Sequence, residues 1–225
     1  MIPLNDNIPS QRFPFVNWLL ILGNIAVFII EISASDTRAF IYEYGLIPGQ
    51  TTLLGEGSRS FFTNMFLHGG WGHLLTNMWM LYIFGDNVEN RMGSFRYLLF
   101  YLLAGLIASA THYFLYQASE VPAIGASGAI SGVMAAYMFL FPGSLIISFV
   151  PLFFIPLLIP IPAFVFIGIW FIGQFLSGTF DLLLDSPGTG IAFWAHIGGF
   201  IGGLAIYRGF TKRKKVAYKN HANIY

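Results

Sequence analysis

Two polar side chains in the apolar second half of the chain have the types needed for nucleophilic chemistry: Ser127 in the string IGASGAIS and His196 in FWAHIGGFIGG. A serine hydroxyl is inert until a base accepts its proton, and histidine is the usual base. Pro122 and Gly125 interrupt the chain before the serine and an apolar run follows, so we expect Ser127 at the start of a helix. The unpaired backbone N–H groups and the positive dipole end at such a start could stabilise a developing oxyanion.

Glycines beside both residues would let their helices approach closely. Gly199 and Gly203 lie on the same helical face as His196, and Gly128 and Gly132 follow the serine with the spacing of a small-xxx-small pair. If these two faces meet, the imidazole comes within hydrogen-bond reach of the hydroxyl. A packing seam alone would explain the glycines, but it would leave the buried imidazole and hydroxyl without a purpose.

The string HGGWGHLLTNM, at residues 68–78, carries further polar groups. His73 and Asn77 are one helical turn apart, which places them on one face, and both side chains can donate hydrogen bonds to an oxyanion. His68 stands just before this helix. A single buried polar residue usually makes only an interhelical hydrogen bond, so the inference rests on the joint occurrence of these residues with the serine and the histidine.

These residues must be positioned by helices in a membrane. Of the 225 residues, 56% are hydrophobic and 9% charged, and the hydrophobic residues form runs of about 18 or more, enough to cross a hydrocarbon core as a helix. The chain has no cysteine, which excludes disulfides, thiol nucleophiles and thiolate metal sites. We predict one all-α membrane domain with six spanning helices, at residues 15–34, 70–87, 95–116, 125–141, 161–178 and 191–209.

The segment between the fourth and fifth predicted spans is apolar but rich in proline. It contains Pro142, Pro151, Pro156, Pro160 and Pro162. This proline density argues against one continuous helix and favours a short interfacial or looped stretch, although counting it as a span would give seven. The first residues of the chain are polar and interrupted by prolines, without the features of a removable signal peptide.

Basic residues indicate the orientation of the spans. With six spans both termini lie on one side, which would hold Arg12, Arg91, Arg96, Arg208, Lys212, Arg213, Lys214, Lys215 and Lys219. The other side would hold Arg38 and Arg59, so we predict cytoplasmic termini. The external loop at 35–69 is rich in aromatic residues and is expected to pack on the membrane surface or dip into it. The basic cluster after the last span is interpreted as a topological anchor rather than a patch for nucleic acid.

Together the polar strings resemble the rhomboid family of intramembrane serine proteases. The resemblance is carried by GASG at 125–128, AHIGGFIGG at 195–203 and HGGWGHLLTNM at 68–78, and FGDNVENRMGS at 84–94 is similar to the family's E-x-R segment. It covers nearly the whole chain, with the motifs in the family's order. As a set the motifs are highly specific, whereas GxSG alone would not be.

The resemblance implies a role for each matching residue. Ser127 would be the nucleophile and His196 the general base, forming a dyad without an acidic third member. His73, Asn77 and the backbone N–H of Ser127 would stabilise the oxyanion. His68 would be structural and help to hold the first external loop.

The resemblance also implies structural roles for Glu89 and Arg91, which would fix the cytoplasmic end of the second span, and for Gly199 and Gly203. It implies a serine endopeptidase that hydrolyses peptide bonds in or near transmembrane segments of other membrane proteins. No cofactor, metal or nucleic acid is expected, and the partners would be the substrates and the lipid bilayer.

The expected domain organisation is a six-span protease domain at 15–209, between a cytoplasmic segment at 1–14 and a basic cytoplasmic tail at 210–225. A short chain of this kind looks prokaryotic, which predicts a multi-pass protein of a prokaryotic plasma membrane. Substrate, pathway and oligomeric state do not follow from the residues.

The chain departs from the family pattern in two places. Many members carry a Trp-Arg pair in the first external loop, where this chain has Arg59 followed by Ser60. Some members place a tyrosine four residues after the nucleophile, where it stacks on the catalytic histidine, but here that residue is Ser131. Another group must then orient the His196 ring, and the sequence does not identify it.

Other functional classes fit less well. A membrane metalloprotease needs an H-E-x-x-H helix, and the sequence contains no such string. An intramembrane aspartyl protease needs two buried aspartates, but Asp86 is near a cytoplasmic boundary, and Asp181 and Asp185 are expected in an external loop. A transporter would show paired broken helices in two halves, which the sequence does not show. An inactive rhomboid-like protein that binds transmembrane segments would share the fold, but such proteins typically lack the serine or the histidine.

Overall fold

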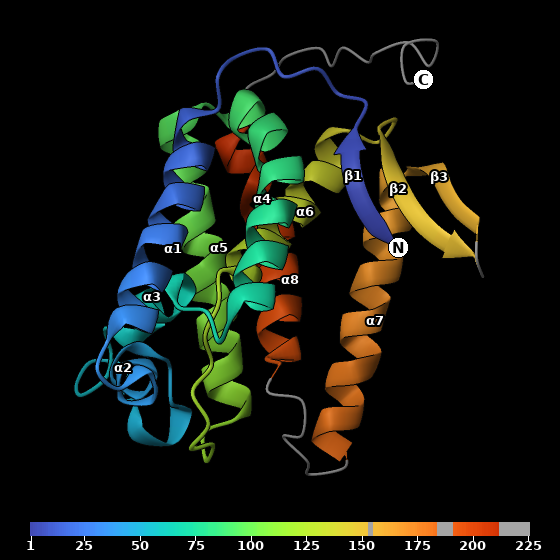
Figure 1. Cartoon of the computed structure of the whole chain (residues 1–225). Helices are drawn as coiled ribbons and strands as arrows, with labels where there is room; N and C mark the ends of the chain where they lie inside the picture. The colour runs from blue at the N-terminus through green and yellow to red at the C-terminus, as the bar shows by residue number, and fades with distance from the viewer. Residues whose placement is uncertain (153–154, 184–190, 212–225) are drawn as a thin grey trace.

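The computed structural model describes residues 1–152, 155–183 and 191–211, and most of them are helical. Six helices are long: α1 (Phe15–Ser33), α4 (Trp71–Met92), α5 (Ser94–Leu115), α6 (Ser127–Leu140), α7 (Ala163–Leu183) and α8 (Phe193–Phe210). Each of them falls on one of the six apolar segments predicted from the sequence. They pack as a bundle in which α1 starts and α8 ends at the same end (Figure 1).

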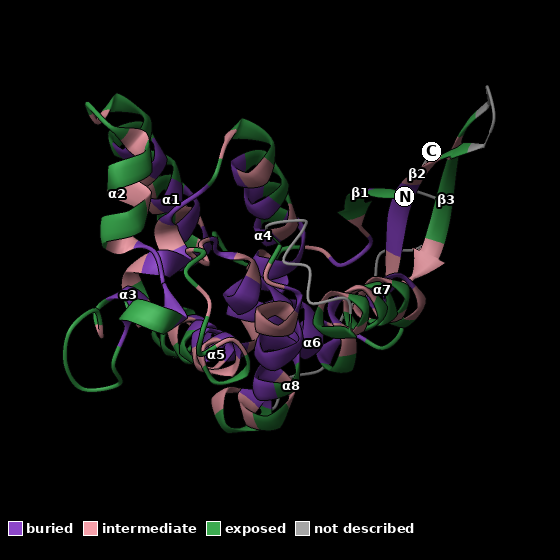
Figure 2. Ribbon diagram, turned by 90° about the horizontal axis from the view of Figure 1, so that it is seen from below, coloured by how far each residue is buried: buried purple, intermediate pink, exposed green. Residues whose placement is uncertain are grey.

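Three of these helices are long and apolar enough to cross a membrane, by length and composition, within the described part of the chain: α1, α5 and α7. Helix α6 is apolar but shorter. Many of its residues are small, and most of them are buried because α4, α5, α7 and α8 pack around it. Figure 2 shows this burial at the centre, whereas few residues of α7 are buried. Apolar residues on the outside of a bundle are typical of helices that face lipid.

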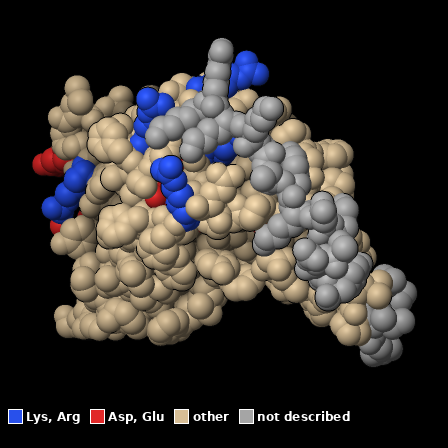
Figure 3. Space-filling view, turned by 90° about the horizontal axis from the view of Figure 1, so that it is seen from above, with Lys and Arg blue, Asp and Glu red and all other residues tan. Residues whose placement is uncertain are grey.

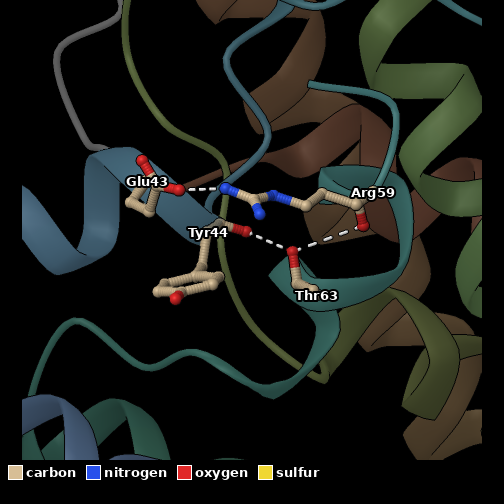
Figure 4. Close-up of polar contacts among 4 residues, drawn as sticks. All are labelled: Glu43, Tyr44, Arg59 and Thr63. Atoms are coloured by element: carbon tan, nitrogen blue, oxygen red, sulfur yellow. Dashed lines mark hydrogen bonds and ion pairs between the residues drawn. The ribbon is translucent and has the colours of Figure 1, made fainter. Parts of the chain in front are cut away.

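The chain between α1 and α4 forms short helical pieces rather than a bare linker. They are α2 (Thr37–Tyr44), η1 (Pro48–Gln50), α3 (Ser60–Thr63) and η2 (Asn64–Phe66). Arg59 forms an ion pair with Glu43 and lies over the Tyr44 ring, and the Thr63 hydroxyl donates to the Tyr44 carbonyl at 2.6 Å (Figure 4). Arg59 therefore ties α3 to α2 even though Ser60 follows it.

The proline-rich stretch forms a hairpin of β2 (Leu145–Leu152) and β3 (Ile155–Pro162), to which β1 (Ile2–Asp6) adds a third antiparallel strand in the order β1-β2-β3. The prediction that no helix spans this stretch is confirmed. The protein is mostly helical, as expected, but it is not all-α, because a β-hairpin stands where the sequence predicted an interfacial or looped stretch. Prolines that break helices are tolerated at an edge strand. The partner strand β1 lies far away in the sequence, so local patterns did not indicate the pairing.

Glu89 joins α4 to the start of α1. Its carboxylate accepts hydrogen bonds from the backbone N–H groups of Val16 (3.2 Å) and Asn17 (2.8 Å), which are unpaired donors at the first turn of α1. The Arg91 guanidinium lies over the Phe141 ring, 6.0 Å from its centroid. Both residues thus hold the end of the bundle where α4 ends and α1 begins.

Basic residues are concentrated at this same end. Arg12 precedes α1, Arg96 lies in the first turn of α5, and Arg208 lies in the last turn of α8. Arginine side chains of the described residues lie on the face seen in Figure 3. The remaining basic residues of the predicted tail, from Lys212 to Lys219, lie outside the described residues.

Candidate active site

Ser127 and His196 meet between α6 and α8, although 69 positions separate them in the chain. The distance between Ser127 Oγ and His196 Nε2 is 2.7 Å, a normal hydrogen bond. Both side chains are partly buried. The sequence-based expectation that these two residues approach each other is met by the geometry of the fold.

The predicted glycine seam explains how α6 and α8 come so close. A side-chain carbon placed on Gly199 would collide with the carbonyl group of Gly128, and one placed on Gly203 would collide with the backbone of Gly132. The two helices therefore touch backbone to backbone, which requires glycine at these positions.

The turn before Ser127 places it at the first position of α6, as predicted. Gly125 has a φ of 127°, a conformation that residues with a Cβ rarely adopt. Its N–H donates to the carbonyl of Asn64 at 2.8 Å, and Leu46 and Ala123 exchange two backbone hydrogen bonds of 3.0 and 2.8 Å. The connection between α1 and α4 thus holds the chain that leads to Ser127, and the first-turn N–H groups of α6 remain available to a ligand.

Two residues of α7 hold the His196 ring, and sequence reasoning missed both. Gln174 Oε1 lies 2.6 Å from His196 Nδ1, and the Trp170 ring lies 6.0 Å from the imidazole, tilted by 35°. Ser131, at the position of the stacking tyrosine, instead donates to the Ser127 carbonyl at 2.6 Å. The sequence pattern that could have indicated them is a tryptophan and a glutamine one helical turn apart in an otherwise apolar helix.

His73 lies on the other side of Ser127. A Cβ placed on Gly125 would be 2.7 Å from His73 Nε2 and 3.5 Å from Ser127 Oγ, so both atoms border the same small space. His73 Nδ1 accepts a hydrogen bond from the Gly69 N–H at 3.4 Å. The imidazole proton therefore sits on Nε2, which faces the space beside Ser127 and can donate into it.

Asn77 follows His73 by one turn of α4, and His68 precedes it in the loop. The Asn77 amide nitrogen is buried and has no hydrogen-bond partner among the described residues, so a donor is free. The His68 ring is fully buried between the rings of Phe28 and His73, and the His68 backbone N–H donates to Glu31 at 3.0 Å. Its position fits a structural role.

Comparison with known proteins places the residues of this site within one family domain. The family model of the rhomboid domain matches residues 56–213, which include His68, His73, Asn77, Ser127, Gln174 and His196. The chain belongs to the rhomboid family. Its helical bundle is therefore that of a membrane protein.

Several curated proteins resemble this rhomboid chain. The chloroplastic Rhomboid-like protein 11 of Arabidopsis thaliana is 40% identical over 56% of this chain and 42% of its own length. The Rhomboid protease GluP of Bacillus subtilis is 32% identical over 56% of this chain and 24% of its own length. The mitochondrial RHOMBOID-like protein 12 of Arabidopsis thaliana is 29% identical over 63% and 43%. This chain thus spans less than half the length of these relatives.

A small cavity adjoins Ser127 of this rhomboid protein on the side of α5. Its volume is about 20 Å³, and polar groups of Asn64, Ser109 and His112 line it beside Ser127. The Asn64 amide donates to the Ser109 hydroxyl at 3.0 Å. The sequence did not indicate that these residues belong to the site. They come together only because the connection between α1 and α4 packs on α5.

The two described candidates for an aspartyl protease, Asp86 and Asp181, do not lie together. Asp86 lies in the second half of α4, and Asp181 lies in the last turns of α7 at the opposite end of the bundle (Figure 1). Asp181 was expected in a loop, but it belongs to the helix and accepts a hydrogen bond from the Tyr116 hydroxyl at 3.0 Å. Asp185 lies outside the described residues. Within the described ranges no group of three or more His, Asp or Glu side chains is placed to hold a metal ion.

Proposed function

We propose that this rhomboid protein is an intramembrane serine endopeptidase that uses Ser127 and His196 as a dyad. The observation that supports this most directly is the 2.7 Å contact between Ser127 Oγ and His196 Nε2 at the start of a buried helix. If the hydroxyl and the imidazole only stabilised the packing of two helices, they would not need a space beside them that hydrogen-bond donors can reach. Here that space is bordered by His73 and by the first-turn N–H groups of α6.

The reaction follows from the positions of the protons. Gln174 Oε1 can only accept, so it holds a proton on His196 Nδ1 and leaves Nε2 unprotonated. Nε2 takes the proton of Ser127 as Oγ attacks the carbonyl carbon of a peptide bond, and the carbonyl oxygen becomes an oxyanion. The C–N bond then breaks, and the leaving amine takes the proton from Nε2. Water hydrolyses the resulting ester by the same proton transfers in reverse order.

The oxyanion would be bound by three donors: the Ser127 backbone N–H, His73 Nε2–H and the Asn77 amide. The Gly69 N–H supports the required tautomer of His73 because it occupies Nδ1. The Asn77 amide nitrogen is a buried donor with no partner in the described part of the chain, which leaves it available to a reacting oxygen.

All six long helices would span the membrane, with both ends of the 15–209 domain and the flanking segments 1–14 and 210–225 in the cytoplasm. An even number of long helices and the basic residues where α1 starts and α8 ends support this orientation. The substrates would be transmembrane segments of other proteins. The relatives include chloroplastic, mitochondrial and bacterial proteins, so the prokaryotic plasma membrane predicted from the sequence stays a prediction.

Labelling of the purified protein by a fluorophosphonate probe tests this proposal. We expect labelling of the wild-type chain, loss of labelling in Ser127→Ala and in His196→Ala, and loss of cleavage of a transmembrane reporter in both variants. A wild-type chain that is folded, binds the reporter and neither labels nor cleaves would instead identify a rhomboid-like protein that only binds transmembrane segments.

A further inference from the structure

The three-stranded sheet projects from the bundle beyond the start of α7 (Figures 1 and 2). It has no part in the site around Ser127. Strand β3 runs into α7 without a linker, since β3 ends at Pro162 and α7 begins at Ala163. The chain from Val121 to Phe180, which includes the whole hairpin, contains no Asp, Glu, Lys or Arg.

The register of the hairpin shows which backbone groups face its open edge. The Ala163 N–H donates to the Ser144 carbonyl at 3.0 Å, so this opposed pair bonds across the ladder. Bonded and non-bonded pairs alternate in an antiparallel ladder. The odd-numbered residues of β3 therefore bond to β2, and the even-numbered residues direct their backbone outward.

Three of the four outward-facing positions of β3 are proline. They are Pro156, Pro160 and Pro162, and the fourth position is Leu158. Proline has no N–H, so this edge presents a single outward donor, at Leu158. A further strand from another protein would need these donors to pair, so the edge is closed to strand addition.

The open edge of this sheet also lacks the features of an edge strand that is exposed to water. Leu158 is 61% exposed and Ile159 is 37% exposed, and neither β2 nor β3 contains a charged residue. Edge strands in water are usually protected by charges. In lipid no water is present to pair with backbone N–H groups, so an edge strand there is more stable when it has few of them. The outward carbonyl oxygens still need donors, which fits the boundary between headgroups and acyl chains better than the middle of the bilayer.

We propose that the β2–β3 hairpin is embedded in lipid, with its open edge and the side chains of Leu158 and Ile159 at the headgroup–acyl boundary. The apolar outer surface of α7 continues directly into this edge, and α7 is a helix that can cross the membrane. The proposal rests on the membrane position of α7. The proposed orientation of the bundle makes the cytoplasmic leaflet the one that holds the hairpin.

The absence of cysteine from the chain permits a direct test. Single variants Leu158→Cys, Ile172→Cys and Glu56→Cys of the full chain carry a nitroxide label and are reconstituted in phosphatidylcholine–phosphatidylglycerol vesicles. Ile172 is an exposed residue of α7 and reports on lipid, whereas Glu56 is exposed in the external connection and reports on water. Collision rates with oxygen, which is enriched in lipid, and with a water-soluble nickel chelate are then measured.

We expect the label at 158 to resemble that at 172, with severalfold less collision with nickel than at 56. Nickel access equal to that at 56 would overturn the proposal, and so would spin–spin broadening that places two copies of β3 side by side. Fluorophosphonate labelling of each variant shows that the site is intact. It is read separately, so a chain without protease activity would still answer the question about lipid.

Discussion

Gln174 of α7 and His196 of α8 are joined by a contact of 2.6 Å between Oε1 and Nδ1. This contact lies on the opposite side of the imidazole from Ser127, whose Oγ is 2.7 Å from Nε2. The ring is thus held between an acceptor and a hydroxyl, which is the arrangement that a buried aspartate provides in a catalytic triad. In this chain a neutral amide occupies that place, and the position of a stacking tyrosine is taken by Ser131.

Replacing Gln174 by leucine should lower kcat by about tenfold or more, with a smaller change in KM, because the proton would no longer be held on Nδ1 and the base would be available for a smaller fraction of the time. Gln174→Glu keeps an acceptor and should retain most of the rate. Reporter cleavage and the rate of fluorophosphonate labelling measure both variants.

Thr179→Val is the matched control for Gln174. Thr179 lies on the same helix, and among the described residues its hydroxyl bonds only to the Phe175 carbonyl of its own turn, at 2.8 Å. This variant should label at the wild-type rate. A Gln174→Leu variant that also labelled at the wild-type rate would remove Gln174 from the mechanism and leave the dyad untouched.

Removing one oxyanion donor should slow turnover without preventing substrate binding. We expect His73→Ala and Asn77→Ala each to lower kcat by about ten- to a thousandfold, since these groups would bind charge that develops in the transition state. Asn90→Ala, on the same helix but with its amide bonded to the Ser10 hydroxyl at 3.3 Å, should have little effect. Wild-type kcat in both His73→Ala and Asn77→Ala would refute the assignment.

Gly203→Ala should push α8 away from α6, because the added carbon would meet the backbone of Gly132. Overpacking of this kind costs about 1–3 kcal/mol, and the displacement of His196 should also reduce labelling. Gly209→Ala on the same helix meets no atom within 4 Å and should be neutral or slightly stabilising. Thermal unfolding in detergent and probe labelling, compared between the two variants, measure the difference.

Glu89→Ala should reduce the stability of the bundle by about 1–2 kcal/mol, the usual cost of losing a helix cap. The variant removes the acceptor for the Val16 and Asn17 N–H groups at the start of α1. Glu43→Ala breaks an exposed ion pair with Arg59 and should change the unfolding temperature much less. Equal shifts in the two variants would mean that the Glu89 contacts do not stabilise α1.

The sequence by itself determined where the long helices lie, because a long run of mainly apolar residues without proline has few other stable forms in a membrane. It also determined that α6 starts at Ser127, since Gly125 interrupts the chain just before it. The approach of α6 to α8 could be predicted from Gly199 and Gly203. Glycines spaced along one helix face form a local sequence pattern that is typical of a close contact with another helix.

Only the tertiary structure decided what orients His196 and what pairs with the proline-rich hairpin. Gln174 could have faced lipid or the bundle, and its helix periodicity does not say which residue of another helix it meets. Strand β1 pairs with β2, which lies about 140 residues later, and the Asn64 carbonyl holds Gly125 from the connection between α1 and α4. These contacts join residues far apart in the sequence, where local propensity carries no information, so their partners are selected by the packing of the whole bundle.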